Sequence, residues 1–321
     1  MTLTDWVARF AELRVLVIGE AMLDSYVSGS VGRVCREAPV PIVALNARHD
    51  VPGGAANTAM AVAALGGACA FLSVIGQDEA GVILAERLAD AGVDTDALLA
   101  VPGRETIVKQ RISARGQLLL RLDRGSEGDM PELIERRLID ALATAWARAD
   151  AVIASDYGYG ICTDRVIAAI ARLQRRDPRV LVADAKDLRR WAGAGLSAAK
   201  PNYAEAIALA DLPAREGIER VEQMIAARDT LAARTGARLL AVTLDTAGAV
   251  VFDEGCEPYR TFTSPAPDSR AAGAGDTFTA ALALALAAGA QSANAADLAA
   301  AAAAACVAAP GTTSCTAEML H

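Results

Sequence analysis

Short apolar segments alternate with helical segments along most of the chain, and this alternation restricts the possible folds more than any other feature. Segments that are apolar throughout are typical of strands buried on both faces of a sheet. The expected strands cover residues 15–18, 70–75, 151–155, 180–183 and 239–244. The expected helices cover residues 57–65, 79–91, 131–148 and 164–175, lie around Glu205 and Glu219, and include two Ala-rich helices near the end. The pattern predicts an α/β fold, a three-layer α/β/α sandwich with a mostly parallel central sheet.

One region departs from this pattern. Residues 106–113 and 117–123 have the character of strands in which polar and apolar residues are interleaved, joined by a glycine turn. This is typical of a hairpin with one face open to solvent or ligand. We interpret residues 22–48 and 104–124 together as a small β-sheet lid on a single domain that covers residues 1–321.

Composition argues against several classes of protein. Hydrophobic residues make up 53% of the 321 residues and charged residues 22%, so the chain can bury a core and is not expected to be disordered. The net charge is −8 and no cluster of Lys and Arg stands out, which argues against nucleic acid as a partner. Since the histidines are His49 and His321 alone, we do not expect a histidine base or a site with several histidine ligands.

Cysteine spacing and hydropathy predict where the protein works. No two of the six cysteines have C-x-x-C spacing, so neither a zinc site nor a redox motif is indicated, and scattered thiols suit a reducing cytoplasm. Asp5, Arg9 and Glu12 interrupt the apolar residues that a signal peptide would need. The most apolar stretch, residues 278–290, is shorter than the ~20 residues that span a bilayer, so we expect a buried helix and no membrane partner.

The sharpest motif is the segment Gly273–Thr277, which opens an apolar helix. The first amides of a helix have no internal partner and lie at the positive end of its dipole, so they form a site for an anion. Gly273, Ala274 and Gly275 let the backbone approach such a ligand closely. Asp276 is then a candidate catalytic base, and the alternative is that it only caps the helix.

A second glycine cluster also precedes a helix. Gly53 and Gly54 are candidates for a tight backbone surface against a sugar, with Asn57 holding a hydroxyl. The alternative is a plain turn in which Asn57 caps the helix. Asp24 lies just beyond the first strand, where ligands bind in a doubly wound sheet, and could accept two sugar hydroxyls. The alternative for Asp24 is a solvated surface acid.

Two further segments are candidates for a nucleotide site. Asn202 and Glu205 fit a capping box, and the functional alternative puts both near ATP phosphates and Mg²⁺, with Glu205 binding the metal through water. Thr243 follows an apolar strand, with Gly248 five residues on, and the pair could hold a nucleotide.

Basic residues on the expected lid are candidates for holding a substrate phosphate. Lys109 and Arg111 are two residues apart, so on a strand they share one face, and Arg121 lies on the partner strand. The alternative is an ordinary solvated sheet edge.

Taken in order, these residues resemble the ribokinase-type (PfkB) family of carbohydrate kinases, over about Val15 to Thr313. The family's two signatures correspond to the glycine pair before Asn57 and to Gly273–Thr277. Within the family, the chain looks most like kinases of D-glycero-D-manno-heptose 7-phosphate. The segments that carry this likeness are Gly19–Asp24, Arg36–Val43, Pro52–Asn57, Thr106–Arg111, Leu120–Asp123 and Ser155–Tyr157.

The resemblance implies an activity and its participants. It implies a ribokinase-like sandwich with a β-sheet lid, ATP and Mg²⁺ as cosubstrates, and Asp276 as the base that activates the C1 hydroxyl of the sugar phosphate. Asp156 and Lys186 join the expected substrate-binding residues. The product would be the 1,7-bisphosphate of lipopolysaccharide core synthesis. The resemblance also implies a homodimer through the lid. Many relatives are fused to a nucleotidyltransferase, but this chain leaves no room for one after Thr313, so we expect the stand-alone form of the kinase.

Three departures from the family pattern qualify these expectations. Relatives usually carry Asp-x-Thr where this chain has Arg270, Ala271 and Ala272, so a monovalent cation site is in doubt and Arg270 could supply the charge itself. Tyr159 replaces a lysine, and Ala300 replaces an asparagine near the adenine. The alternatives left open are a family kinase for a different sugar, and a nucleotide-binding regulator without catalysis.

Overall fold

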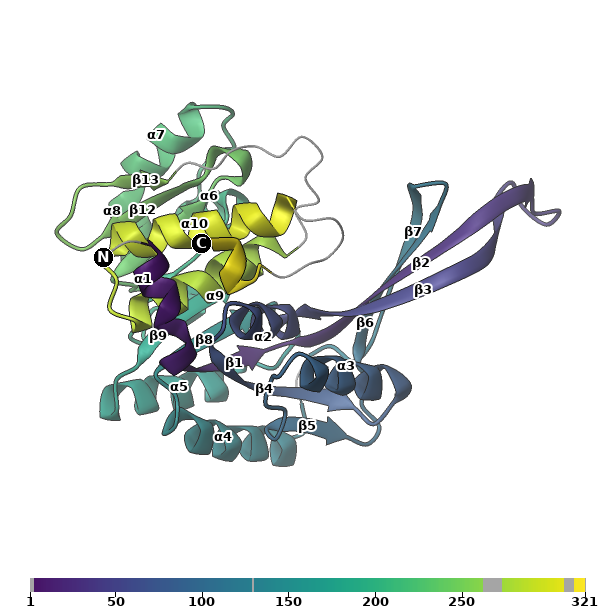
Figure 1. Cartoon of the computed structure of the whole chain (residues 1–321), viewed down its shortest axis with the longest axis horizontal. Helices are drawn as coiled ribbons and strands as arrows, with labels where there is room; N and C mark the ends of the chain where they lie inside the picture. The colour runs from purple at the N-terminus through teal and green to yellow at the C-terminus, as the bar shows by residue number, and fades with distance from the viewer. Residues whose placement is uncertain (1–2, 129, 262–272, 309–314, 321) are drawn as a thin grey trace.

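The central feature of the computed structural model is a large twisted sheet with helices on both faces (Figure 1). The structure describes residues 3–128, 130–261, 273–308 and 315–320. Within them, nine strands form this sheet in the order β13-β12-β11-β10-β9-β8-β1-β4-β5. Their bounds are β1 Arg14–Gly19, β4 Ala68–Gly76, β5 Leu98–Val101, β8 Ala151–Asp156, β9 Val180–Ala185, β10 Ala198–Ala199, β11 Leu239–Thr243, β12 Ala249–Asp253 and β13 Tyr259–Thr261.

The strands from β5 to β11 are parallel to their neighbours, and only β12 and β13 pair antiparallel. The expected strands are thus confirmed, and a hairpin around Gly248 joins β11 to β12. Solid apolar runs are found here because parallel strands covered by helices present both faces to a core.

Two hydrophobic cores lie on opposite faces of the sheet, so the three-layer prediction is confirmed. Along β1, Val15 and Val17 join one core and Leu16 and Ile18 the other, because successive side chains alternate. The first core packs against α1 Leu3–Ala8, α2 Ala55–Ala64, α3 Glu79–Asp90, α9 Ala274–Ala287 and α10 Ser292–Ala308. The second packs against α4 Glu132–Trp146, α5 Asp164–Arg176, α6 Tyr203–Ala210, α7 Glu219–Ala226 and α8 Arg228–Thr235.

Close approach of two strands explains one glycine in the sheet. Gly19 ends β1 with φ +158°, and a Cβ there would lie 1.9 Å from the carbonyl oxygen of Ser155 on β8. Any side chain would push these neighbours apart. The chain leaves β1 at this point and enters the second sheet through Glu20.

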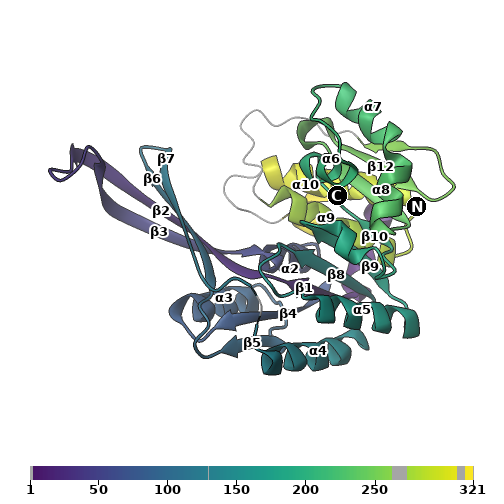
Figure 2. The same ribbon diagram turned by 180° about the vertical axis from the view of Figure 1, so that it is seen from behind.

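The second sheet projects away from the body of the molecule (Figures 1 and 2). Its four strands have the order β3-β2-β6-β7. Their bounds are β2 Ala21–Val34, β3 Pro41–Gly54, β6 Ile107–Ala114 and β7 Gln117–Arg124. The strands cover the segments expected to form the lid, although β3 runs on to Gly54. Their role as a lid on a single domain stays a prediction.

This smaller sheet exposes apolar side chains. All eight residues of the edge strand β7 are exposed, four leucines among them. The exposed large apolar residues of this sheet and its turn are Val34, Val40, Ile42, Leu45, Leu118, Leu119, Leu120 and Leu122. An exposed, apolar edge strand is a template for pairing with another chain.

Among the described helices, none has the length and apolarity needed to cross a bilayer.

Candidate active site

A polar cavity of about 190 Å³ lies where the carboxyl ends of three parallel strands meet the start of α9. This is the edge at which α/β sheets bind ligands. The cavity is lined by Asp156, Tyr157, Asp184, Lys186, Lys200, Asn202, Glu205, Gly273, Gly275 and Asp276. The structure therefore brings the expected anion loop together with Asp156, Lys186, Asn202 and Glu205.

Asp276 lies in the first turn of α9 and is buried. Asn57 donates to its Oδ2 at 2.6 Å, and Thr58 and Tyr157 donate to its Oδ1 at 3.2 and 3.1 Å. Burial raises the pKa of Asp276 to about 6, with Asp184 adding to the rise, while the hydrogen bonds from Asn57 and Tyr157 oppose it. The capping alternative is wrong, because these donors come from other elements and Gly273 is the cap residue.

Gly273 has the left-handed conformation that glycine favours, with φ +90°. A Cβ on Gly273 would lie 2.9 Å from Nδ2 of Asn57, so any other residue here would disturb the bond from Asn57 to Asp276. Gly275 faces the ammonium of Lys200, which would lie 3.5 Å from a Cβ at that position. The glycines thus let the side chains of Asn57 and Lys200 approach the start of α9, and their predicted approach to a ligand stays a prediction.

Asn57 does not cap its helix, so that alternative is also wrong. Helix α2 begins at Ala55, two residues before Asn57, and Gly54 is its cap residue. Gly53 and Asp24 meet across the β2–β3 ribbon, where a Cβ on Gly53 would lie 2.2 Å from Oδ2 of Asp24. Gly53 therefore makes room for the Asp24 carboxylate.

The buried Lys200 forms an ion pair with the partly buried Asp184 at 3.0 Å, and neither residue was among the predicted site residues. Burial lowers the pKa of Lys200, but Asp184, Glu205 and Asp276 together raise it by more, so the net shift is upward and the lysine stays charged. Asp184 also accepts from the Thr279 hydroxyl on α9 at 3.1 Å. Their position in the sequence could have identified them. Asp184 directly follows the expected strand 180–183, and Lys200 directly follows β10.

The capping box predicted at Asn202 and Glu205 is confirmed at the start of α6. Glu205 accepts a hydrogen bond from the backbone amide of Asn202 at 3.0 Å with one carboxylate oxygen and from the Lys186 ammonium at 2.6 Å with the other. Among the described residues, no group of three or more His, Cys, Asp or Glu could hold a metal by itself. The donor set fits Mg²⁺ only if phosphate and water oxygens supply most ligands, as is usual for this ion.

Asp156 borders the cavity, but both of its carboxylate oxygens already accept hydrogen bonds from neighbouring groups. Its oxygens accept from Trp191 Nε1 at 3.0 Å, the Gly158 amide at 3.0 Å and Arg190 at 3.4 Å. Burial raises the pKa of Asp156. Its predicted contact with substrate stays a prediction.

The lid cations occupy different surroundings. Arg111 forms an ion pair with Asp24 at 2.5 Å and stacks on Tyr26, with its guanidinium 5.2 Å from the ring centre. Lys109 accompanies them on the same face of the sheet, since Asp24 is its register partner on β2. Arg121 pairs with Asp123 at 2.6 Å and its side chain is 46% exposed, which is the environment of a solvated edge.

Two tyrosines surround Lys109. Its ammonium lies 3.3 Å from the Tyr159 hydroxyl, 5.1 Å from the Tyr159 ring centre and 6.0 Å from the Tyr157 ring centre. The loop after β8 therefore meets the lid through aromatic contacts with the Lys109 ammonium.

The remaining predicted positions do not line this cavity or lie outside the described residues. Thr243 forms an isolated β-bridge with Asn202. Gly248 lies in the turn between β11 and β12, where an added Cβ would lie 2.2 Å from the carbonyl oxygen of Thr261. Ala300 is buried in α10. Arg270, Ala271 and Ala272 lie outside the described residues, and the nucleotide roles of Thr243 and Gly248 stay predictions.

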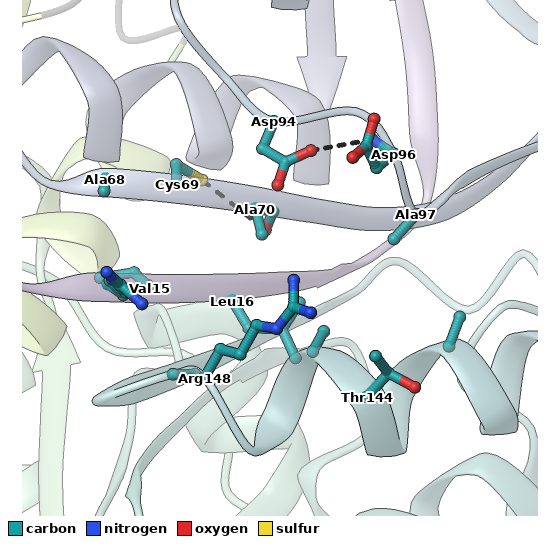
Figure 3. A pocket seen from close by; sticks show the side chains of 14 residues that line it. Val15, Leu16, Ala68, Cys69, Ala70, Asp94, Asp96, Ala97, Thr144 and Arg148 are labelled. Atoms are coloured by element: carbon teal, nitrogen blue, oxygen red, sulfur yellow. Dashed lines mark hydrogen bonds between the residues drawn. The ribbon is translucent and has the colours of Figure 1, made fainter.

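A larger cavity, of about 430 Å³, lies at the opposite end of the strands (Figure 3). It is bordered by the starts of β1 and β4 and by α4, and many of its lining residues are alanines. Thr144 projects from α4 and Arg148 from the turn that follows it, and Asp94 and Asp96 project from the facing loop. No candidate catalytic group described above borders it.

The fold is ribokinase-like. Ribokinase of Arabidopsis thaliana, solved with ribose and ATP, matches with a TM-score of 0.75 at 22% identity over 96% of this chain and 97% of that one. Phosphofructokinase-2 of Escherichia coli, solved with potassium, matches with a TM-score of 0.78 at 21% identity over 96% and 97%. The ribokinase-like fold prediction is confirmed.

Residues 12–319 match the family described as pfkB family carbohydrate kinase, so the chain belongs to this family and is an ATP-dependent carbohydrate kinase. The bifunctional protein HldE of Gluconobacter oxydans is 33% identical over 265 residues, 82% of this chain and 54% of that protein. HldE of Chromohalobacter salexigens is 38% identical over 268 residues, 83% and 54%. The chain spans about half the length of these curated relatives.

The raised pKa of Asp276 predicts how its replacement affects stability. In the parent, the folded state holds this proton more tightly than the unfolded state, so ionisation weakens folding as pH rises through about 6. We expect Asp276→Asn to stabilise the protein relative to the parent at pH 8. At pH 5 this gain should be smaller by about 1.4 kcal/mol, one pKa unit. Urea unfolding at both pH values measures the difference.

Asp140→Asn, at an exposed position on α4, is the matched control and should change stability equally at the two pH values. A gain at Asp276 that does not depend on pH would contradict the prediction.

Proposed function

We propose that this kinase transfers the γ-phosphoryl group of ATP to the C1 hydroxyl of D-glycero-D-manno-heptose 7-phosphate, forming the 1,7-bisphosphate used in lipopolysaccharide core synthesis. Two observations support the substrate. The sequence segments around Asp24, Asn57 and Arg111 resemble kinases of this heptose phosphate, and the curated relatives named HldE are 33–38% identical over this part of their length.

The observation that carries the proposal is the buried carboxylate of Asp276 at the start of α9. A base works best when its pKa lies near the working pH, and burial brings the pKa of Asp276 to about 6. Asp276 accepts the proton of the sugar hydroxyl as that oxygen attacks phosphorus and the bond to ADP breaks. Asn57, Thr58 and Tyr157 hold the carboxylate in one orientation for this transfer.

Positioning and charge carry most of a phosphoryl transfer. The amides of Gly273, Ala274 and Gly275, at the positive end of α9, are suited to stabilise charge on the phosphoryl oxygens. Lys200 and Lys186 add positive charge to the same cavity. Asn202 and Glu205 would support Mg²⁺ through water, and the ion would neutralise phosphate charge when bound.

The sugar phosphate brings about two negative charges into an acidic protein, so local cations must hold it. Lys109 and Arg111 share one face of the lid, beside Asp24. We assign the far phosphate to these cations and the sugar hydroxyls to Asp24 and Asn57. In this arrangement the Arg111–Asp24 pair joins the phosphate end of the substrate to its hydroxyl end.

The lid also supports a homodimer. The edge strand β7 leaves one row of backbone groups without a partner strand within the described chain, and its leucines are exposed. Pairing of β7 with a strand from a second copy of the chain would satisfy the backbone groups and cover the leucines.

Replacing Asp276 with Asn keeps the shape and removes the base. We expect turnover to fall by ~10²–10⁴-fold, the usual range for a general base, with little change in the affinity for sugar or ATP. An ADP-release assay measures turnover and calorimetry measures binding. Near-normal turnover would remove Asp276 from this role.

Replacing Arg111 with Ala tests the substrate. We expect the KM for heptose 7-phosphate to rise at least tenfold, about 1.4 kcal/mol, while the KM for ATP stays within twofold. Arg33→Ala, which removes an exposed lid cation farther along β2, is the control and should leave both constants unchanged.

A parallel rise in both constants would assign Arg111 to lid closure or folding. Equal efficiency with unphosphorylated sugars would reject the heptose phosphate and leave the kinase assignment standing.

The edge strand predicts a dimer in solution. Light scattering at micromolar concentration should give twice the chain mass, and Leu120→Lys on β7 should shift it toward the monomer. Leu133→Lys is the control, since Leu133 is similarly exposed but lies on α4. A monomeric parent would count against the proposal.

A further inference from the structure

The loop that follows β8 contacts the candidate base, the lid and the β1–β2 junction. We propose that Tyr157 is a positioning residue for Asp276 and that the buried carboxylate of Glu20 holds Tyr157 in place, an inference that rests on the proposed role of Asp276 as the base.

Tyr157 meets three charged groups at once. Its hydroxyl donates to Oδ1 of Asp276 at 3.1 Å. The ammonium groups of Lys109 and Lys186 lie 6.0 and 5.9 Å from its ring centre. Burial and the negative charge of Asp276 raise the pKa of Tyr157 well above its usual value, so the phenol keeps its proton and remains a donor.

Glu20 organises the loop that carries Tyr157. Its side chain is fully buried and accepts from the amide of Tyr157 at 2.7 Å and from those of Tyr159 and Ile161 at 3.2 Å each. One carboxylate thus collects three amides that would otherwise need other partners. Burial, with nearby Asp156 adding to the effect, raises the pKa of Glu20 to about 7.

The backbone of Glu20 holds the other donors to Asp276. Its carbonyl oxygen accepts from the amide of Ala55, the first residue of α2, at 3.0 Å. Helix α2 supplies Asn57 and Thr58, whose side chains also donate to Asp276. Glu20 therefore links all three donors, through its side chain to Tyr157 and through its backbone to α2.

A Tyr157 that donates to Asp276 affects the pKa of that carboxylate, whereas a tyrosine that only fills space would not. A donor to the charged carboxylate favours ionisation and lowers the pKa of Asp276, against the effect of burial. Losing the hydroxyl should raise that pKa and leave the carboxylate held by Asn57 and Thr58 alone. The other groups that face Asp276 are Asn57 and Thr58 on α2, Asp184 near the end of β9, Lys200 after β10 and the Cys306 thiol on α10.

Tyr157→Phe removes the hydroxyl and keeps the ring. We expect kcat to fall roughly tenfold, the scale of one hydrogen bond to a charged group, with the KM for the sugar phosphate within twofold. The acid limb of the pH profile of kcat/KM should move upward by about one pH unit. Steady-state rates from pH 5 to 8.5 measure both effects.

Tyr159→Phe is the matched control, two residues on in the same loop. Its hydroxyl contacts Lys109 and not Asp276, so its acid limb should stay in place and any loss should appear in the KM. Titration of Glu20 and Asp156 is common to both variants and cancels in the comparison. An unmoved acid limb in Tyr157→Phe, or an equal shift in both variants, would overturn the proposal.

Glu20→Gln gives a second test. We expect kcat to fall, and the double variant with Tyr157→Phe to have the kcat of Tyr157→Phe alone, because the Glu20 side chain acts on Asp276 through Tyr157. Additive losses would overturn the link from Glu20 to Tyr157. Asp276→Asn separates the two levels: if it is inactive while Tyr157→Phe is normal, only this inference fails, and if it is active, the proposed base fails.

Discussion

The burial of one carboxylate at the start of α9 is the constraint on which the rest of the site depends. Removing a charge from water is costly unless donors surround it, and Asp276 receives them from Asn57, Thr58 and Tyr157. These donors come from α2 and from the loop after β8, so the carboxylate can form its bonds only when both elements are correctly placed against α9. The glycines serve the same requirement, since a side chain at Gly273 would displace Asn57.

Charge is arranged so that a protein with net charge −8 can offer cations to anionic substrates. Lys200 stays charged although it is buried because Asp184 lies 3.0 Å away, and Lys186 is held by Glu205. On the lid, Arg111 is paired with Asp24 and Lys109 lies against the rings of Tyr157 and Tyr159. Each cation of the site is therefore held by a neighbouring acid or ring, which fixes its position at the cost of some of its free charge.

The sequence predicted what depends on neighbours along the chain. Runs of apolar residues identified β1, β4, β8, β9 and β11, and the capping box at Asn202 follows from local spacing. The pairing of Asp184 with Lys200, and of Glu20 with the loop after β8, depends on the strand order β10-β9-β8-β1, which no local pattern encodes. Asn57 was open to interpretation as a cap for the same reason: its partner Asp276 is 219 positions away.

The two buried carboxylates set stability against activity. The pKa of Glu20 is raised from 4.5 to about 7 and that of Asp276 from 3.8 to about 6, so the folded state binds more protons than the unfolded state between these limits. Both groups therefore favour folding least at the upper end of this range, and their penalty grows as pH rises from about 4 to 7. A base must be ionised to accept a proton, so the conditions that make Asp276 competent are those in which its burial costs most. The hydrogen bonds that Glu20 organises around Asp276 offset part of that cost at the atom where the proposed chemistry takes place.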